Sequence, residues 1–229
     1  MPRRKLRPHF ARPFTKREIA RGAHRMRVGG RWRQMGEHQR DFLVGQGLEP
    51  DALFLDVGCG ALRAGIPLVE YLEPGGYYGI DINQSLLDAG YEVEMPAELR
   101  GKLPRDHLRA TDRFDCDFGV TFDWAIAQSL FTHIALNDIR LCLYRVAKVM
   151  RPGGRFYVTI FEAPQGFPVD GLLESKGTGK AKKYGERNPF WYWASDIEWA
   201  AGLSPWSYRY IGDWAHPRGQ HMLELTRTE

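Results

Sequence analysis

The sequence has few cysteines and no long apolar run. Its 229 residues contain three cysteines, Cys59, Cys116 and Cys142, and no two of them form a C-x-x-C pair. An odd number without such spacing argues against a disulfide framework and a cysteine-based zinc site, so we expect a cytoplasmic protein. No run approaches the roughly 18 apolar residues of a membrane span. The basic N-terminus lacks a following apolar segment, so we expect no secretory signal.

Extreme composition is also absent. Hydrophobic residues make up 43% of the chain and charged residues 26%, which is ordinary for a globular protein and excludes disordered or fibrous classes. No internal repeat or coiled-coil heptad is present. The length fits one domain, or one domain with an appendage.

Positive charge is concentrated at the N-terminus. Residues 1–40 hold thirteen Lys or Arg and two acidic residues, whereas the remainder of the chain is net acidic. We therefore divide the chain into a basic arm or lid over 1–36 and a main domain over 37–229. Such an arm either binds nucleic acid or packs on its own acidic body. Residues 1–20 contain three prolines, so we expect them to be loose and dispensable for folding.

Short apolar runs alternate with segments of helical periodicity. This alternation predicts an α/β fold with a mostly parallel sheet, and the last two strands, with no helix between them, predict an antiparallel hairpin. A long loop is expected over 163–190. The expected strands are 53–57, 77–82, 107–111, 121–128, 155–162, 206–212 and 221–227, and the expected helices are 37–46, 62–72, 85–95, 137–150 and 194–203.

A glycine-rich turn follows the first expected strand. Asp56, Gly58 and Gly60 stand where this strand ends and a helix begins, which is the usual ligand position in open α/β sheets. Glycines allow a ligand to approach the backbone closely. Asp81, at the end of the second strand, is placed to accept both hydroxyls of a ribose. The pattern therefore predicts a ligand that contains a nucleoside.

Two common nucleotide signatures are missing. Arg63 stands where the third glycine of G-x-G-x-x-G would be, and no G-x-x-x-x-G-K-[ST] loop is present. Asp56 would repel a pyrophosphate but suits a cationic group. An adenosyl ligand with a positively charged amino-acid end therefore fits Asp56 and Asp81 together.

Four ordered motifs resemble those of class I S-adenosylmethionine-dependent methyltransferases. They are LDVGCG, GIDIN, FDWAIAQSLFTHI and VAKVMRPGGRFYV, and they cover about 53–161. The resemblance implies a Rossmann-like sheet of seven strands in the order 3-2-1-4-5-7-6, with strand seven antiparallel and helices on both faces. It also implies S-adenosylmethionine as the methyl donor.

The same resemblance implies which residues bind the cofactor. An acid facing the adenine follows strand three, where Asp112 is favoured over Asp115 and Asp117. Gln128, followed by Ser129, would lie under the sulfonium. The full cofactor set is Asp56, Gly58, Cys59, Gly60, Asp81, Ile82, Asn83, Asp112, Arg113, Phe114 and Gln128.

The acceptor side is less defined. His133 follows strand four and is either a general base or a buried structural histidine. The aromatic stretch 190–193 forms core or walls a substrate pocket, while Trp32 and Gly36 belong to a lid or to a surface helix. The histidines show no metal-ligand spacing, so no metal site is expected.

The acceptor motif of amino-DNA methyltransferases, [DNS]-P-P-[YFW], is absent. We therefore expect an enzyme that methylates an oxygen or nitrogen of a small molecule, such as a secondary metabolite, a saccharide or a lipid intermediate. An RNA or protein methyltransferase that uses the basic arm, and an inactive adenosyl-binding module, are the alternatives. The oligomeric state is not indicated.

Overall fold

The computed structural model describes residues 8–166, 172–174, 181–183 and 189–229. The chain divides into two compact units, Met1–Trp124 and Ala125–Glu229. Within the described ranges, no helix combines the length and apolar character needed to cross a bilayer.

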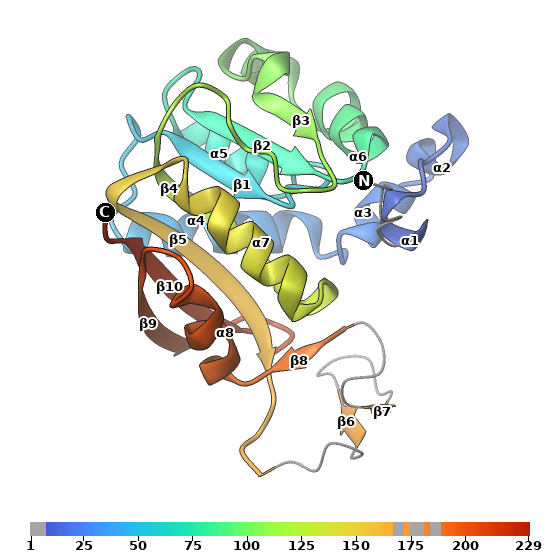
Figure 1. Cartoon of the computed structure of the whole chain (residues 1–229). Coiled ribbons are helices and arrows are strands. Elements are labelled where there is room, and N and C mark those ends of the chain that lie inside the picture. Colours follow the sequence, from blue (N-terminus) through green and yellow to red (C-terminus); the bar gives the residue numbers. More distant parts are fainter. Residues whose placement is uncertain (1–7, 167–171, 175–180, 184–188) are drawn as a thin grey trace, which may run out of the picture. The chain divides into compact units, whose positions relative to one another are not determined.

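The first unit contains three parallel strands and the helices that connect them (Figure 1). Asp56 of β1 pairs with Gly79 of β2, and Asp81 of β2 pairs with Ala110 of β3. The carboxyl ends of β1 and β2 therefore lie side by side. The elements are α1 Pro8–Ala11, α2 Lys16–Ala20, α3 Ala23–Arg27, α4 Trp32–Gly45, β1 Phe54–Val57, α5 Gly65–Tyr71, β2 Tyr77–Asp81, α6 Gln84–Ala89, a π-helical turn Gly90–Glu94, 3-10 turns Ala97–Lys102 and Arg105–His107, and β3 Leu108–Ala110.

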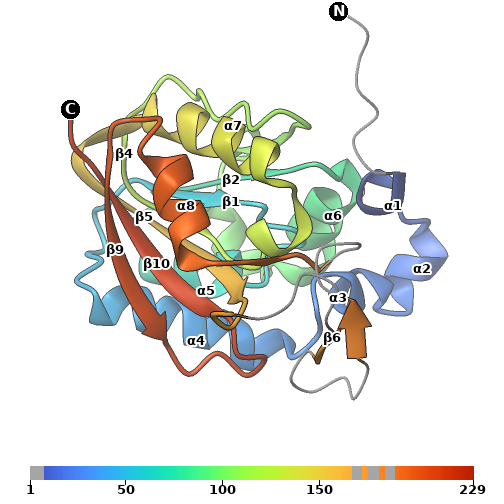
Figure 2. The same ribbon diagram turned by 60° about the horizontal axis from the view of Figure 1, so that its bottom comes forward.

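The second unit contains an antiparallel set of strands with two helices (Figure 2). β10 lies between β5 and β9 and is antiparallel to both. β4, Phe122–Ala127, crosses the boundary between the units. The other elements are a 3-10 turn Phe131–His133, α7 Leu136–Ala147, β5 Met150–Glu162, β6 Leu172–Glu174, β7 Ala181–Lys183, β8 Trp191–Tyr192, α8 Ala194–Ala201, β9 Trp206–Asp213 and β10 His221–Arg227.

The strand order of the sheet is β3-β2-β1-β4-β5-β10-β9. Counted without the short inserted strands, this is the predicted order 3-2-1-4-5-7-6, and the antiparallel seventh strand is β10. The predicted α/β Rossmann-like fold is confirmed. The short β8 adds a parallel partner to the end of β5, where Glu162 pairs with Tyr192.

Strand burial follows the topology. All four residues of β1 and four of the five in β2 are buried. Strands buried on both faces are continuous apolar runs rather than alternating patterns, which is why the sequence indicated them clearly. Asn83 caps α6, because its side chain accepts a hydrogen bond from the Ser85 N–H.

Two expectations about loops were wrong within the described residues. The long loop expected over 163–190 contains the β6–β7 hairpin, in which Leu172 pairs with Lys183. Between 163 and 188 the structure describes only this hairpin and residues 163–166. The break expected between the helix 137–150 and the strand 155–162 is also absent, because α7 ends at Ala147 and β5 begins at Met150 and runs through the R-P-G-G sequence, with Gly153 at φ 78°. A glycine inside a strand marks a local irregularity rather than the end of the strand.

The N-terminal segment is not loose where the structure describes it. Helices α1 and α2 occupy much of 8–20, and Phe14 is buried in a cluster with Ala61 and Leu86. The Thr15 side chain caps α2 by accepting from the Glu18 N–H, and the Glu18 carboxylate accepts from the Thr15 N–H. The expectation failed because a single aromatic residue anchors a segment whose composition is otherwise polar.

Candidate functional site

The glycine-rich turn at the end of β1 folds tightly against β2. Gly58 and Gly60 have φ of 82° and 57°, which favours glycine. The backbone N–H groups of Gly58 and Cys59 both donate to the Ile80 carbonyl, at 2.7 and 3.0 Å. A Cβ at Gly60 would lie 2.6 Å from Val28 Cγ1. Conformation and space therefore both require glycine at position 60.

Asp81 fastens this turn to the end of β2. Its Oδ2 accepts from the Gly60 N–H at 3.0 Å, and its Oδ1 accepts from the Asn83 N–H at 2.8 Å. Burial raises the pKa of Asp81 to about 6, against the opposing effect of these backbone donors. Each carboxylate oxygen accepts more than one hydrogen bond, so Asp81 retains capacity for ligand hydroxyls. Ile82 follows it and is half-buried.

Asp56 lies inside the first unit rather than at the open edge. It is 5% exposed and accepts a hydrogen bond from the Tyr77 hydroxyl at 2.8 Å. Burial is the main cause that raises its pKa to about 7. A Cβ at Gly65 would lie 2.7 Å from the Tyr77 hydroxyl oxygen, so the Asp56–Tyr77 pair needs glycine beside it.

We expect Asp56 to make stability depend on pH. Its pKa rises from the usual 3.8 to about 7 on folding, so the folded state holds a proton that the unfolded state releases between pH 4 and 7. Stability is full below about pH 4 and falls as the pH rises toward 7. In Asp56→Asn, which still accepts from Tyr77, this fall of up to about 4 kcal/mol should disappear. Urea unfolding of both proteins from pH 4 to 8 measures the free energy of unfolding. If that free energy changes with pH equally in both proteins, the raised pKa does not belong to Asp56.

Cys59 acts as a small packing residue. Its side chain is buried, and a Cβ at Gly79 would lie 2.8 Å from its Sγ. Burial raises the pKa of the thiol well above its usual value. A thiol in such surroundings is inert, which agrees with a filler role for the side chain.

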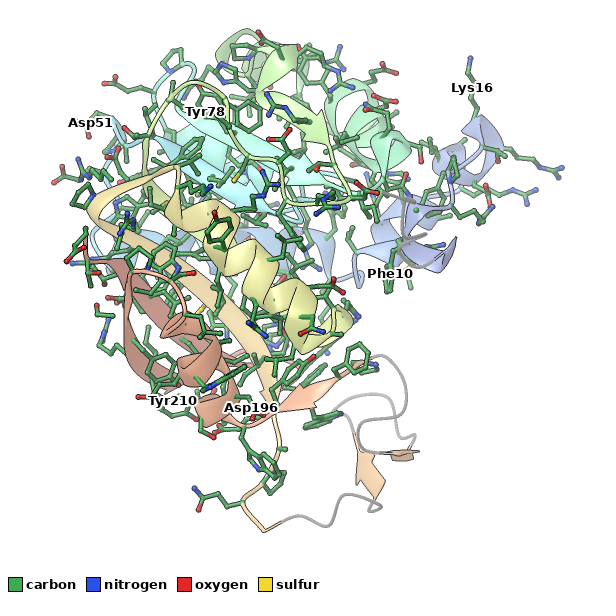
Figure 3. The ribbon with its side chains drawn as sticks, in the orientation of Figure 1. Phe10, Lys16, Asp51, Tyr78, Asp196 and Tyr210 are labelled. Carbon is green, nitrogen blue, oxygen red and sulfur yellow. The ribbon has the colours of Figure 1, made fainter. Side chains whose placement is uncertain are left out.

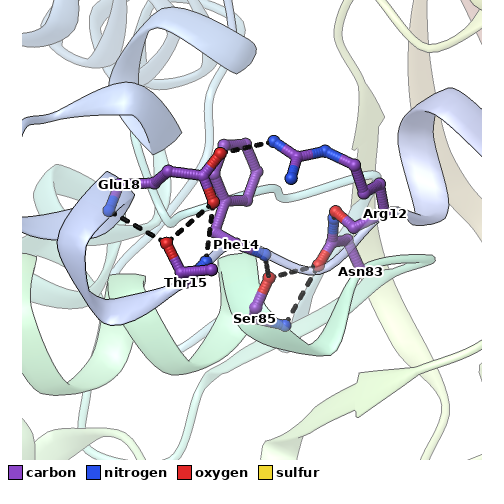
Figure 4. A network of polar contacts seen from close by, with 6 residues as sticks. All are labelled: Arg12, Phe14, Thr15, Glu18, Asn83 and Ser85. Carbon is purple, nitrogen blue, oxygen red and sulfur yellow. Dashed lines mark hydrogen bonds and ion pairs between the residues drawn. The ribbon is translucent and has the colours of Figure 1, made fainter.

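The N-terminal segment contacts both sides of the glycine-rich turn. Asn83 Nδ2 donates to the carbonyls of Phe10 and Arg12, both at 2.9 Å, and Ser85 Oγ accepts from the Phe14 N–H at 2.8 Å (Figure 4). The expected adenine-side residue Asn83 therefore also holds the segment. Nothing in the sequence indicated this contact between Asn83 and the N-terminal segment.

Arg63, on the other side of the glycine-rich turn, also contacts the N-terminal segment. Its Nη1 donates to the carbonyls of Val28 and Gly30, at 2.5 and 3.2 Å. The residue that breaks the dinucleotide signature therefore binds the N-terminal segment. Trp32 begins α4, and a Cβ at Gly36 would lie 2.3 Å from the Arg63 carbonyl oxygen, so α4 packs closely on the turn.

The loop after β3 presents the three candidate acids. Asp115 pairs with Arg109 at 3.6 Å, and Asp117 accepts from the Gly119 N–H at 3.0 Å, so both have structural partners. Asp112 is exposed. Thr111, just before it, donates its N–H to the Asp81 carbonyl at 2.8 Å. Asp112 therefore directly follows the residue that joins this loop to Asp81.

The two residues after Asp112 shape this loop. The Arg113 N–H donates to Thr111 Oγ1 at 3.2 Å. Phe114 adopts φ 56°, which is uncommon for an aromatic residue. Strained backbone of this kind occurs at ligand sites.

In the second unit, a buried polar cluster surrounds the end of β4. Gln128 contacts Ser129 Oγ at 2.7 Å and His216 Nε2 at 3.1 Å. Thr159 and Gln220, both almost fully buried, complete the cluster. Only Gln128 and Ser129 were predicted. His216 and Gln220 were missed because the β9–β10 loop carries no motif of its own, and Thr159 was missed because it lies within the apolar run of β5.

His133 ends the 3-10 turn Phe131–His133 and is half-buried. The aromatic stretch lies beside this turn: the Phe190 N–H donates to the Thr132 carbonyl at 2.7 Å, and the Tyr192 hydroxyl donates to the Ile134 carbonyl at 2.7 Å. Trp191 stacks on Phe161 of β5. The structure thus brings His133 and the aromatic stretch together.

A second polar cluster lies at the end of β5. The side chain of Tyr210, on β9, is partly exposed (Figure 3) and donates to Glu162 Oε2 at 2.5 Å. His221 Nδ1 contacts both the Tyr210 hydroxyl, at 2.7 Å, and Glu162. Among the described residues, no group of three or more His, Cys, Asp or Glu side chains is arranged to hold a metal ion.

Comparison with known proteins agrees with this geometry. Residues 55–156 match a family model described as a methyltransferase domain. The fold resembles magnesium protoporphyrin IX methyltransferase from Synechocystis PCC 6803 with bound SAM, at 20% identity and TM-score 0.60, covering 89% of this chain and 82% of that one.

Two further solved structures share the fold. One is a S-adenosylmethionine-dependent methyltransferase from Clostridium acetobutylicum, at 14% identity and TM-score 0.63, covering 93% of this chain and 99% of that one. The other is SAM-bound CalS10, an amino pentose methyltransferase from Micromonospora echinaspora, at 18% identity and TM-score 0.59, covering 94% and 98%. The segment matched by the methyltransferase-domain model carries the turn, Asp81 and β4, and the chain shares its fold with S-adenosylmethionine-dependent methyltransferases.

Proposed function

We propose that this enzyme transfers a methyl group from S-adenosylmethionine to an oxygen or nitrogen of a small molecule. The observation that carries the proposal is the hydrogen bond between Asp81 and the Gly60 N–H, which holds a ribose acceptor beside the glycine-rich turn. Relatives of the same fold act on a porphyrin and on an amino pentose, according to their descriptions. A secondary metabolite, saccharide or lipid intermediate fits the proposal.

These contacts support the proposed cofactor set. Gly58, Cys59 and Gly60 offer backbone to the methionine end, and Asp81 accepts from the ribose hydroxyls. Ile82, Asn83 and the loop Asp112, Arg113 and Phe114 flank the adenine, with Asp112 facing its amino group. Gln128 is assigned to the sulfonium by the family resemblance. Asp56 acts through Tyr77 and the strand end that it stabilises.

The N-terminal segment is proposed to be a lid. Its contacts to Asn83, Ser85 and Arg63 lie on residues that border the cofactor turn. A lid excludes water and holds the cofactor while the acceptor aligns with the methyl group. The sulfonium is already a strong electrophile, so alignment supplies much of the rate.

An RNA or protein acceptor is the second candidate, because the N-terminal segment is basic. Several of its arginines are held within the first unit: Arg25 pairs with Glu94, Arg12 with Glu18 and Arg33 with Glu37. These pairs favour the small-molecule acceptor. Salt-sensitive RNA binding that is lost when the segment is removed would support the second candidate instead.

The experiment begins with calorimetry of the full chain. We expect micromolar binding of S-adenosylmethionine and its demethylated product S-adenosylhomocysteine, and none of a nicotinamide dinucleotide. Labelled cofactor is then incubated with a small-molecule fraction of cell extract, and labelled product is isolated. Binding without any transfer to small molecules, RNA or protein would indicate an inactive binding module.

His133 is the proposed general base if the acceptor is a hydroxyl. Its loss should then lower turnover by roughly 10²–10⁴-fold while cofactor affinity stays unchanged. His133→Gln and His133→Ala are compared for melting temperature and rate on the same preparations. Lower stability with nearly normal turnover per folded molecule would instead show that His133 is structural.

A further inference from the structure

Three side chains meet at the carboxyl end of β5. Glu162 is the last residue of that strand, Tyr210 lies on β9 and His221 begins β10. The Tyr210 hydroxyl donates to Glu162 Oε2 at 2.5 Å, and His221 Nδ1 contacts that same carboxylate oxygen. The side chains of Glu162 and His221 are 25% and 32% exposed, so a small molecule can reach both.

The Glu162 carboxylate decides which ring nitrogen of His221 carries a hydrogen. An ionised carboxylate only accepts hydrogen bonds, so the Nδ1 that contacts it is an N–H group. In the neutral ring, Nε2 then carries no hydrogen and can take a proton. Within the part of the chain that the structure describes, neither His221 Nε2 nor Glu162 Oε1 makes a hydrogen bond. Both atoms are therefore available to a ligand.

Tyr210 holds Glu162 and the imidazole ring in place. Burial, together with the hydrogen bond to Glu162, raises the pKa of Tyr210 above its usual range, so its hydroxyl keeps the hydrogen that it donates. The Tyr210 and His221 rings meet edge to face, with centroids 6.1 Å apart. A carboxylate bound to Nδ1–H orients an imidazole and stabilises the cation that forms when Nε2 takes a proton. The three side chains are thus arranged as a base.

The surroundings of this base are acidic. Besides burial, the negative charges of Glu162 and Asp213 raise the pKa of Tyr210. Besides burial, Glu198 of α8 and Glu162 likewise raise the pKa of Tyr208 on β9. Among the described residues, no lysine or arginine forms an ion pair with any of these three acids. Such a site attracts a cationic group and repels an anionic one.

The base lies next in sequence to residues at the end of β4. His221 follows Gln220, which accepts a hydrogen bond from the Ser129 hydroxyl at 2.9 Å. Glu162 pairs with Tyr192, which belongs to the aromatic stretch considered as the wall of a substrate pocket. Ligands of open α/β sheets bind outside the carboxyl ends of the strands. The base therefore lies at the edge of the sheet that binds ligands.

We propose that the methyl acceptor is an amine and that His221, held by Glu162, takes the proton that the acceptor's ammonium form loses before methylation. The inference rests on the proposed function, since it selects nitrogen as the methylated atom. The N–H electron pair stays on the nitrogen as the hydrogen passes to Nε2. The neutral nitrogen then bonds to the methyl carbon as the S–C bond breaks, with the electrons of that bond remaining on sulfur, and His221 releases its proton to water. A hydroxyl acceptor would instead use His133.

The ring is tested first, in the full chain, by long-range ¹H–¹⁵N spectra of ¹⁵N-histidine-labelled protein near neutral pH. Comparison with His221→Gln assigns the His221 signals. We expect hydrogen on Nδ1 and none on Nε2. Hydrogen on Nε2, in a neutral or a charged ring, would overturn the proposal, and this result does not depend on methyl transfer.

The acceptor class is tested by dividing the small-molecule extract on a cation exchanger. The retained fraction, which contains the amines, and the unretained fraction are each incubated with the full chain and labelled cofactor. We expect labelled product mainly from the retained fraction. Product mainly from the unretained fraction, or equally from both, would overturn the amine assignment and keep the proposed function. Product from neither fraction would overturn both.

The role of His221 is tested with the retained fraction at several pH values. An alkyl ammonium has a pKa of about 10, so about one molecule in a thousand is neutral at pH 7. His221→Gln keeps an N–H group for Glu162 but takes no proton. Its rate relative to wild type should therefore fall roughly 10²–10⁴-fold near pH 7 and recover as the pH approaches about 10. A relative rate that is the same at every pH would show that His221 only packs, which would overturn the proposal.

Two further variants accompany this test. Glu162→Gln removes the charge that stabilises the protonated ring, so we expect a smaller fall with the same recovery at high pH, and this variant decides the question if His221→Gln does not fold. Glu49→Gln, the same substitution at an exposed position in the first unit, is the matched control and should transfer normally. Melting temperatures are measured for each variant at each pH. Transfer by Glu162→Gln equal to that of the wild type would overturn the proposal.

Discussion

Asp81→Ala should bind S-adenosylhomocysteine about 10- to 100-fold more weakly than the wild type. The ribose hydroxyls lose a charged acceptor, worth about 1–3 kcal/mol, and each 1.4 kcal/mol is about tenfold in affinity. The Gly60 and Asn83 N–H groups lose the same partner, so the turn loses the clamp that shapes it. Isothermal calorimetry of both proteins at one pH measures the difference.

Two comparisons make this result specific. Asp106→Ala removes an exposed acid in the 3-10 turn Arg105–His107 and should leave affinity unchanged. The pKa of Asp81 is about 6, so wild-type affinity should rise as the pH increases through that value and the carboxylate ionises. Equal affinity of Asp81→Ala and wild type would show that Asp81 does not bind the ribose hydroxyls.

Phe14→Ala should lower both the stability of the protein and its affinity for the cofactor. Phe14 packs on Ala61 and Leu86, and Arg27 lies 4.9 Å above its ring. Loss of a buried aromatic side chain costs about 3 kcal/mol, at the lower end of the usual range because it lies near the surface. For a chain of this length we expect a fall of roughly 6–12 °C in melting temperature.

The effect on binding follows from the Phe14 backbone, whose N–H reaches Ser85 Oγ beside Asn83. If the segment is a lid, its loosening weakens S-adenosylhomocysteine binding as well. Lys16→Ala, one turn away and exposed, is the control and should change neither quantity. A melting temperature unaffected by Phe14→Ala would restore the view that the segment is dispensable for folding.

Local patterns predicted much of the cofactor half of the site. Buried parallel strands are continuous apolar runs, and a glycine-rich turn with an acid at the end of the next strand has a recognisable spacing. This spacing places Asp81 and Gly60 in the same site, and a hydrogen bond between them is observed. The same local reasoning located β4, β5 and β10, whereas their order in the sheet was implied by the family resemblance and is observed.

Long-range contacts decided the remainder. Phe14 meets Leu86, Asn83 meets the Phe10 and Arg12 carbonyls, and His24 pairs with Glu94, all about seventy residues away along the chain. Local composition correctly describes the N-terminal segment as basic and proline-rich, but it carries no information about a partner so distant in sequence. Local contacts such as the Thr15–Glu18 capping box are joined in 8–20 by these tertiary contacts, which hold the segment on the first unit.

The sequence by itself determined the fold class and the glycine-rich turn, because both depend on periodicity and spacing within a few tens of residues. The strand order was implied by the resemblance of its four motifs to a known family. Only the tertiary structure decided how Gln128 is held, since His216 and Gln220 lie about ninety residues after it and reach it through the β9–β10 loop. Hydrogen-bond direction in that cluster depends on which atoms meet in space. No pattern along the chain specifies it, because the donors and acceptors belong to three separate segments.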